Sequence, residues 1–225
     1  MFKVSPRPVF ITGGTGYVGQ RLAAALVARG HRVRVLTRPQ SVSRVAPGAE
    51  PMVGDALDAS SYVPTLTRDD TLVHLVGTSH PSPAKAAEFR RVDLPSIHAA
   101  VSAARSAGLA HLVYVSVAHP APLMHAYIEV RREGEAAIAS AGLTATVLRP
   151  WYVLGPGHWW PVALIPFYAL CEIASSTRAT AQRLGLVTIG QMVRALVSAV
   201  EHPPAGGTIR VVEVPEIRRA SVERV

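Results

Sequence analysis

Short apolar runs alternate with amphipathic stretches of helical period from residue 8 to residue 150. The apolar runs are rich in Val, Ile and Leu, and we expect them to be strands at 8–12, 32–37, 71–76, 111–116 and 144–148, with a further strand beginning at Met52. The helical patterns lie between them at 16–29, 84–107 and 124–141. Strands that are apolar on both faces and separated by helices predict a parallel sheet covered on both sides.

The pattern changes after Pro150. A loop rich in Gly, Pro and Trp leads into an apolar segment, and a helical pattern at 189–201 and a strand at 208–214 follow. The second predicted helix contains Pro95 and is expected to kink or restart at 93–95. We expect one α/β domain over residues 1–225, in which 151–187 form a small C-terminal insertion.

Composition narrows the class of protein. The chain has 225 residues, a single Cys and 49% apolar residues, which excludes a disulfide framework, a Cys-based zinc site and global disorder. Its formal charge is +8, but the arginines are dispersed and not interleaved with aromatic residues. We therefore expect no nucleic-acid partner, no metal, and a small-molecule ligand bound by a monomer or homodimer.

Targeting signals are not evident. The longest apolar run, 161–171, is shorter than the roughly 18–20 residues that cross a bilayer, and no signal-peptide core is recognised at the start. We therefore expect a cytoplasmic protein. The aromatic, uncharged stretch 159–171 is expected to form core or a substrate pocket, with a dimer face or surface membrane contact as alternatives.

A glycine loop stands between the first strand and the first helix. Gly13, Gly16 and Gly19 allow a tight turn, close approach of a pyrophosphate and close packing of the helix on the sheet. The start of the helix then offers N–H groups to the phosphates. This context predicts a Rossmann-type, doubly wound parallel sheet that binds a dinucleotide.

The end of the second strand bears on the choice of cofactor. NAD-binding proteins usually carry an acid there, which accepts a hydrogen bond from the ribose 2′-hydroxyl. This strand ends in Arg38, whose guanidinium suits a 2′-phosphate. The sequence therefore favours NADP(H) and leaves NAD(H) as the alternative.

The motif TGGTGYVG, followed by GDALD, LVHLVG and LRP, resembles the short-chain dehydrogenase/reductase superfamily over nearly the whole chain. The resemblance is to its extended and atypical branches, which are the NAD-dependent epimerase/dehydratase group and nitrogen-repressor-like NAD(P)-binding proteins. It implies that residues 151–187 form the substrate-site or lid region. Together, the glycine loop, Arg38 and this resemblance predict cofactor contacts from Gly13, Thr15, Gly16, Tyr17, Val18, Gly19, Arg38, Asp55, Ala56, Val76, Gly77 and Pro150.

In that superfamily a Tyr-x-x-x-Lys pair moves the proton. Tyr127 and Arg131 have the same spacing on a predicted helix, with an arginine in place of the lysine. The hydroxyl residue expected after the fifth strand falls near Ala118, and Ser116 is the nearest hydroxyl. We predict catalytic roles for Tyr127, Arg131 and Ser116. His119 and His125 are alternatives to the missing hydroxyl, although we expect both to be solvated.

These features predict an NADP(H)-dependent oxidoreductase acting on a small or hydrophobic carbonyl compound or alcohol. Two alternatives stay open. The replaced lysine and Ala118 are compatible with a catalytically degenerate NAD(P)-binding sensor or accessory protein, and the resemblance also allows an epimerase or dehydratase that uses bound NAD(P).

Overall fold

The computed structural model describes residues 5–157 and 183–220. Its centre is a parallel sheet of seven strands in the order β3-β2-β1-β4-β5-β6-β9. The strands are β1 (Pro8–Thr12), β2 (Arg32–Thr37), β3 (Glu50–Val53), β4 (Thr71–His74), β5 (His111–Val115), β6 (Ala145–Arg149) and β9 (Ile209–Glu213). This arrangement confirms the Rossmann-type fold, because the strand order reverses direction beside β1.

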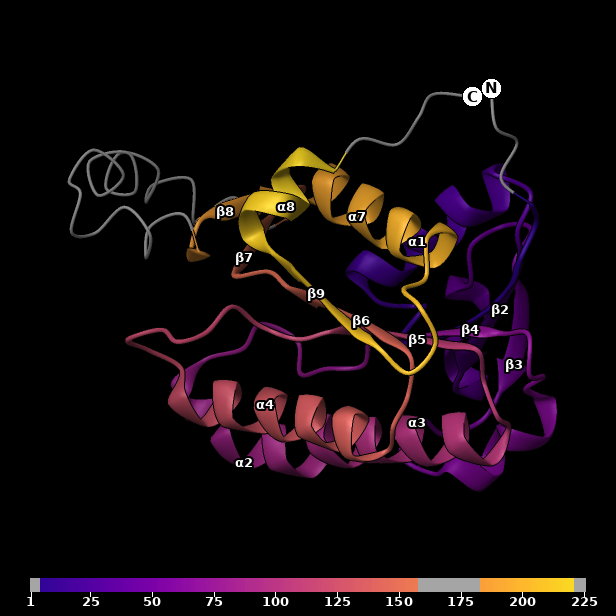
Figure 1. Cartoon of the computed structure of the whole chain (residues 1–225), viewed down its shortest axis with the longest axis horizontal. Coiled ribbons are helices and arrows are strands. Elements are labelled where there is room, and N and C mark those ends of the chain that lie inside the picture. The colour runs from indigo at the N-terminus through magenta and orange to yellow at the C-terminus, as the bar shows by residue number, and fades with distance from the viewer. Residues whose placement is uncertain (1–4, 158–182, 221–225) are drawn as a thin grey trace.

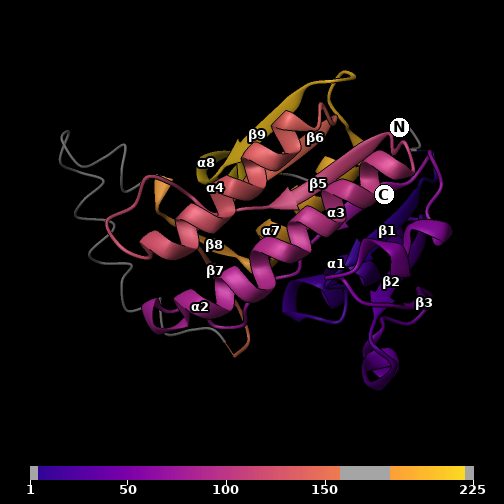
Figure 2. The same ribbon diagram turned by 90° about the horizontal axis from the view of Figure 1, so that it is seen from below.

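Helices cover both faces of the sheet (Figure 1). One layer holds α1 (Tyr17–Ala28), α7 (Ile189–Glu201) and α8 (Val214–Arg219), and the other holds α2 (Ala86–Glu88), α3 (Leu94–Ser106) and α4 (His125–Ser140). Figure 2 shows α3 and α4 side by side across the second face. Apolar side chains such as Ile11 and Leu26 fill the space under the first layer, and Phe10 and Ile97 fill the space under the second. Short turns link the elements at η1 (Pro39–Arg44), η2 (Ala59–Ser61), η3 (Val63–Thr65) and η4 (Pro83–Lys85).

The third strand differs from its sequence-based position. It begins at Glu50 and ends at Val53, so Met52 lies near its end and not at its start. The first half of the strand was not predicted because it contains Pro51, and a proline cannot donate a hydrogen bond to a neighbouring strand. Here β3 is the edge strand next to β2, and an edge tolerates proline.

The long helical stretch is continuous but changes its winding where a kink was expected. Residues Phe89–Asp93 (η5) form a π-helical turn between α2 and α3, and Pro95 lies in the first turn of α3. A π turn inserts an extra residue per turn and re-aims the side chains on it. The turn thereby directs Asp93 into the protein, where its side chain is 1% exposed.

A second, two-stranded parallel sheet was not expected. It joins β7 (Tyr152–Leu154) to β8 (Leu186–Thr188), at the two ends of the predicted insertion. Residues 158–182, which include the whole apolar segment 159–171, lie outside the described residues, so the predicted role of that segment stays a prediction. Among the described residues no helix is long and apolar enough to span a bilayer.

Candidate active site

The glycine loop between β1 and α1 packs so closely that side chains do not fit at two of its glycines. A Cβ on Gly13, whose φ is +76°, would lie 2.7 Å from the carbonyl carbon of Leu75. A Cβ on Gly19 would collide with the carbonyl oxygen of Gly13. Helix α1 starts directly after this turn, and its N-cap, Gly16, supplies no side-chain hydrogen bond. The N–H groups of the first turn therefore face a site suited to phosphates.

The other residues of the loop connect it to neighbouring segments. The carbonyl oxygen of Thr15 accepts a hydrogen bond from Nη2 of Arg44 at 2.8 Å, which ties η1 to the loop. The hydroxyl of Tyr17 packs against Gly155, where a Cβ would collide with it. Val18, in the first turn of α1, is half-buried and packs against the core. The loop thus contacts both the segment after β2 and the segment after β7.

The predicted adenosine contacts lie at the carboxyl ends of two adjacent strands. Thr37 of β2 pairs with Val53 of β3, so Arg38 and the 54–56 segment leave the sheet side by side. Arg38 is exposed, and so is Asp55, whose Oδ1 accepts the N–H of Leu57 at 2.9 Å. Ala56 is half-buried beside it. Because β1 and β2 are parallel neighbours, Arg38 and the start of α1 lie at the same edge of the sheet, where an arginine fits a phosphate on the adenosine ribose.

Asp93 holds the segment that follows β4. Its Oδ2 accepts hydrogen bonds from the N–H of Thr78 at 2.9 Å and from the Thr78 hydroxyl at 2.7 Å. The predicted cofactor residues Val76 and Gly77 come directly before Thr78. Val76 is half-buried and Gly77 is exposed. The carboxylate therefore fixes the backbone directly after the two predicted cofactor residues.

Arg131 is held by the same carboxylate. Its Nη2 donates to Oδ1 of Asp93 at 2.7 Å, and its Nη1 donates to the carbonyl oxygen of Val115 at 3.1 Å. A Cβ on Gly77 would collide with Nη2. Burial alone lowers the pKa of Arg131, but nearby Tyr127, Tyr114 and Asp93 outweigh it and raise the pKa above its usual value. The guanidinium is therefore a charged group anchored inside the protein.

Tyr127 and Arg131 do lie together, as their spacing on α4 predicts. The guanidinium carbon of Arg131 lies 5.0 Å from the centre of the Tyr127 ring. The ring of Phe89 packs against the Tyr127 ring in a tilted arrangement, with 4.9 Å between the two ring centres. Tyr127 is half-buried. Tyr114 of β5 also lies near the guanidinium, with its ring centre at 5.8 Å, and burial raises the pKa of Tyr114 to about 12. The positive charge thus sits over aromatic faces, a cation–π arrangement.

Ser116 follows β5 and is buried, and its hydroxyl donates to Oε1 of Glu135 at 2.5 Å. The carboxylate of Glu135 also accepts hydrogen bonds from Nε and Nη2 of Arg149. Ala118 is fully buried, and its N–H donates to the carbonyl oxygen of Pro150 at 2.9 Å. The hydroxyl of Ser116 is therefore engaged by a carboxylate, and its predicted catalytic role stays a prediction.

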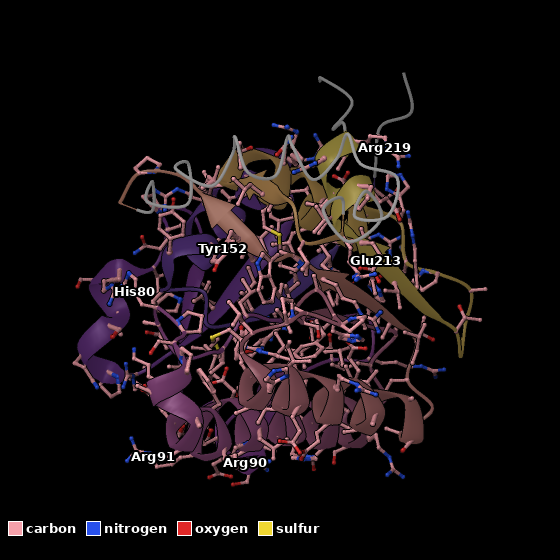
Figure 3. All side chains as sticks on the ribbon, turned by 90° about the vertical axis from the view of Figure 1, so that its left-hand side faces the viewer. His80, Arg90, Arg91, Tyr152, Glu213 and Arg219 are labelled. Carbon is pink, nitrogen blue, oxygen red and sulfur yellow. The ribbon has the colours of Figure 1, made fainter. Side chains whose placement is uncertain are left out.

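The two histidines of this region differ. His125 is exposed, as expected, but the side chain of His119 is only 16% exposed. The expectation that His119 is solvated is wrong, because the loop after β5 folds back against α4 and β6. Figure 3 looks onto this side of the molecule, where Tyr152 and Glu213 lie between the two helical layers.

Sequence reasoning missed Asp93, Glu135 and Arg44. Asp93 and Glu135 are acids inside helical stretches, where a sequence normally places solvated charges, and only the tertiary contacts pair them with Arg131 and Arg149. The signal available was the helical spacing of Arg131 and Glu135, which places both on one face of α4. No feature of the sequence distinguishes Arg44 from the other arginines, so its contact with the glycine loop was not predictable.

The family comparison matches residues 13–155 to a model described as NAD(P)H-binding. Among curated proteins, a ceramide reductase of Caulobacter vibrioides is 29% identical over 94% of this chain and 65% of its own length. A 4-hydroxy-2-methyl-3-oxo-4-farnesyl-3,4-dihydroquinoline-1-oxide ketoreductase of Stigmatella aurantiaca is 30% identical over 65% of this chain and 50% of its own length. The chain thus spans between half and two thirds of these relatives.

Solved structures share the fold. A short-chain dehydrogenase/reductase superfamily protein of Agrobacterium tumefaciens with bound NAD superposes with a TM-score of 0.65 at 19% identity, covering 91% of this chain and 76% of that one. A UDP-N-acetylglucosamine 4-epimerase of Bacillus cereus gives 0.67 at 18% identity, covering 95% and 83%. At these identities the likeness shows the fold alone.

Proposed function

Because this chain belongs to the family of NAD(P)H-binding proteins, we propose that it is an NADP(H)-dependent oxidoreductase for a small or hydrophobic carbonyl compound or alcohol. The family and its reductase relatives make the chain an NAD(P)-binding, oxidoreductase-like protein. The observation that carries the choice of NADP(H) is Arg38, which stands in place of an acid directly after β2, at the same edge of the sheet as the uncapped start of α1.

The residues that would hold the cofactor follow from the site. The first-turn N–H groups of α1, at Tyr17, Val18 and Gly19, would bind the pyrophosphate. Arg38 would pair with the 2′-phosphate, and Asp55 and Ala56 would line the adenine. Val76, Gly77 and Pro150 would line the rest of the nucleotide. When bound, NADP(H) supplies or accepts a hydride.

Tyr127 is the proposed proton donor and acceptor for the substrate oxygen. The guanidinium carbon of Arg131 lies 5.0 Å from the centre of the Tyr127 ring. Asp93 and the carbonyl oxygen of Val115 hold the guanidinium in place, so a fixed positive charge stays beside the tyrosine. That charge would stabilise the negative charge that develops on an oxygen during proton transfer.

We propose that residues 151–187 complete a substrate site of hydrophobic character. The two relatives above are named for a ceramide and for a farnesyl compound, both of which are apolar. The aromatic and uncharged sequence 159–171 suits the same kind of ligand.

The test is calorimetric binding of NADPH and NADH to the wild type and to Arg38→Ala. Charge-assisted hydrogen bonds to a phosphate contribute about 1.5–3 kcal/mol, so the variant should lose roughly tenfold to hundredfold in NADPH affinity and little in NADH affinity. Arg105→Ala, an exposed arginine on α3, is the matched control. Equal affinities of the wild type for the two nucleotides would overturn the choice of NADP(H).

A second candidate function is a nucleotide-binding protein without turnover. The observations that favour it are Ala118 in place of a hydroxyl residue and the anchoring of Arg131 by Asp93. Turnover of NADPH with a panel of hydrophobic ketones, compared between wild type and Tyr127→Phe, separates the two. The oxidoreductase proposal expects a loss of at least about a hundredfold in kcat, within the usual range for general acid–base groups. No turnover with any ketone while NADPH still binds would favour the second candidate.

A further inference from the structure

A pocket of about 460 Å³ opens beside the start of α4. Its walls are His119, Pro120 and Ala121, from the loop after β5, and His125, Ile128 and Arg132, from one face of α4. Helical positions 125, 128 and 132 are spaced by three and four residues, so their side chains point to the same side. Tyr127 and Arg131 lie on another face of the same helix. The pocket and the proposed reactive centre are therefore both built on the first two turns of α4.

The walls combine apolar and basic chemistry. Pro120, Ala121 and Ile128 provide apolar surface, whereas His119, His125 and Arg132 carry nitrogen donors, and none of the six wall residues is acidic. Neither His125 nor Arg132 forms a hydrogen bond or an ion pair with any residue in the described part of the chain, and both are exposed. Their donors are available to a ligand.

The acids behind the pocket are already paired. Glu135 accepts hydrogen bonds from Ser116 and Arg149, and Arg149 also donates to Glu213 at 3.0 Å. Nε2 of His119 lies 3.6 Å from Oε1 of Glu135, and this buried nitrogen has no hydrogen-bond partner among the described residues. These carboxylates thus compete only weakly for the basic groups of the wall.

The charge around His119 supports the same view. Burial lowers the pKa of His119, Arg149 and Arg132 lower it further, and Glu135 and Glu213 only partly oppose them. The positive charges of Arg149 and Arg132 therefore disfavour the protonated form of His119. An anion in the pocket would be favoured by those charges and would also favour protonation of the histidine. The start of α4, a 16-residue helix without a side-chain cap, adds a partial positive charge.

We propose that this pocket binds the anionic oxygen group, a carboxylate or a phosphate, of a ligand whose body is apolar. Arg132 and His125 contact the anion, and Pro120 and Ile128 contact the carbon chain. The identification of this ligand as the substrate rests on the proposed function. The binding of an anion in the pocket is independent of it.

The experiment is calorimetric titration of three probes with the same aryl-alkyl body into the full chain: 4-phenylbutanoate, 3-phenylpropyl phosphate and 4-phenylbutanamide. The variants are Arg132→Ala and His125→Ala, both at exposed positions, and the control is Arg105→Ala. At least one of the two anions should bind at least tenfold more tightly than the neutral amide. Each pocket variant should raise its Kd about tenfold, and the control should not. Comparison of the carboxylate with the phosphate identifies the preferred anion.

The proposal fails if the amide binds as tightly as both anions, or if the pocket variants bind the anions like the control. NADPH is titrated into the same proteins as an independent measurement. Anion binding that responds to Arg132→Ala in a protein without affinity for NADPH would support the pocket and refute the proposed function. If turnover is found, Arg132→Ala should raise KM for a ketone bearing the preferred anion and leave kcat within about twofold. The same variant should leave KM for an uncharged ketone unchanged.

Discussion

At the scale of single residues, Gly77 and Arg131 show how one side chain determines what can stand opposite it. The guanidinium occupies the space that any Cβ at position 77 would need. Conformational freedom does not explain this glycine, since no positive φ is found there. The close approach explains the glycine, because Asp93 holds Nη2 of Arg131 against the backbone at position 77.

We therefore expect Gly77→Ala to destabilise the protein by about 1–3 kcal/mol, the usual cost of overpacking a closely packed site. The displaced backbone should also weaken NADPH binding, because Gly77 lines the proposed cofactor site. Urea unfolding and NADPH calorimetry measure the two effects. Gly206→Ala is the control, because a Cβ there meets no atom within 4 Å. Equal stability of the two variants would contradict the collision.

His74 is a second residue whose state is set by its surroundings. Nδ1 of His74 contacts the Thr12 hydroxyl at 2.8 Å, and Nε2 contacts the Ser96 hydroxyl at 3.2 Å. The Ser96 hydroxyl donates to the carbonyl oxygen of Asp93, so Nε2 of His74 must be the donor in its contact. Burial and the charge of Arg131 lower the pKa of His74 to about 3. The ring is therefore neutral in the folded protein.

A neutral buried histidine makes stability depend on pH. Unfolded His74 takes up a proton below about pH 6.5, whereas the folded ring does so only near pH 3, so stability should fall as the pH drops through this window. The limiting slope for this one group is about 1.4 kcal/mol per pH unit. His74→Gln should remove that share of the slope. Denaturant unfolding between pH 7 and pH 4.5 tests it, and an unchanged slope in the variant would refute the assignment.

At the scale of elements, the turn Phe89–Asp93 does more than accommodate Pro95. Its π winding aims Asp93 at Thr78 and Arg131, so one carboxylate joins the segment after β4, the α2–α3 stretch and α4. The position of the interruption was predictable from Pro95 in the sequence. Its form was not, because the choice between a kink and a π turn depends on the partners that Asp93 finds in space.

Removal of this carboxylate should leave Arg131 charged and buried without a partner. We expect Asp93→Asn to cost roughly 3–5 kcal/mol of stability, and the double variant Asp93→Asn with Arg131→Met to recover part of the loss. Glu129→Gln, which breaks the exposed pair of Glu129 with Arg90, should cost less than about 1 kcal/mol. Chemical denaturation compares the three. A double variant no more stable than Asp93→Asn would contradict a loss caused by unpaired charge.

The repeating elements themselves were predictable. Helix 189–201 was located at its observed bounds, and the first, second, fourth, fifth and sixth strands were found within two residues of their ends, because apolar periodicity and glycine stops reflect local physics. The pairing of β7 with β8 and the helix α8 were missed. Strands of three residues carry too little periodicity to recognise, and β7 and β8 are held by a partner more than thirty residues away.

At the scale of the whole molecule, a cluster at the far end of the sheet joins segments distant in sequence. Nε and Nη2 of Arg29, after α1, donate to the carboxylate of Glu201 at the end of α7, and His31 lies 3.2 Å from the same carboxylate. Burial raises the pKa of Glu201, but the hydrogen bonds from Arg29 and His31 outweigh it and lower the pKa below its usual value. The cluster fixes α7 against α1 at the end opposite the glycine loop.

Glu201→Gln should therefore cost about 3 kcal/mol at pH 7, because it leaves Arg29 and His31 facing a neutral group. Since the pKa of Glu201 is lowered on folding, its stabilisation is complete above about pH 4.3 and is lost as the pH falls through the folded pKa. Wild type and variant should converge in acid. NADPH affinity should not change, because the proposed cofactor site lies at the other end of α1. A weaker affinity would show that the two ends are coupled.

The pairing of β7 with β8 has a consequence for how such a chain diversifies. The two strands fix the points at which the chain leaves and rejoins the Rossmann core, at Leu154 and Leu186. Doubling the length of a loop between two fixed ends costs only about 0.6 kcal/mol of closure free energy. Insertions, deletions and exchanged segments between β7 and β8 should therefore leave the cofactor-binding core intact. The stretch between them is the natural place to exchange segments among relatives when the aim is a new ligand.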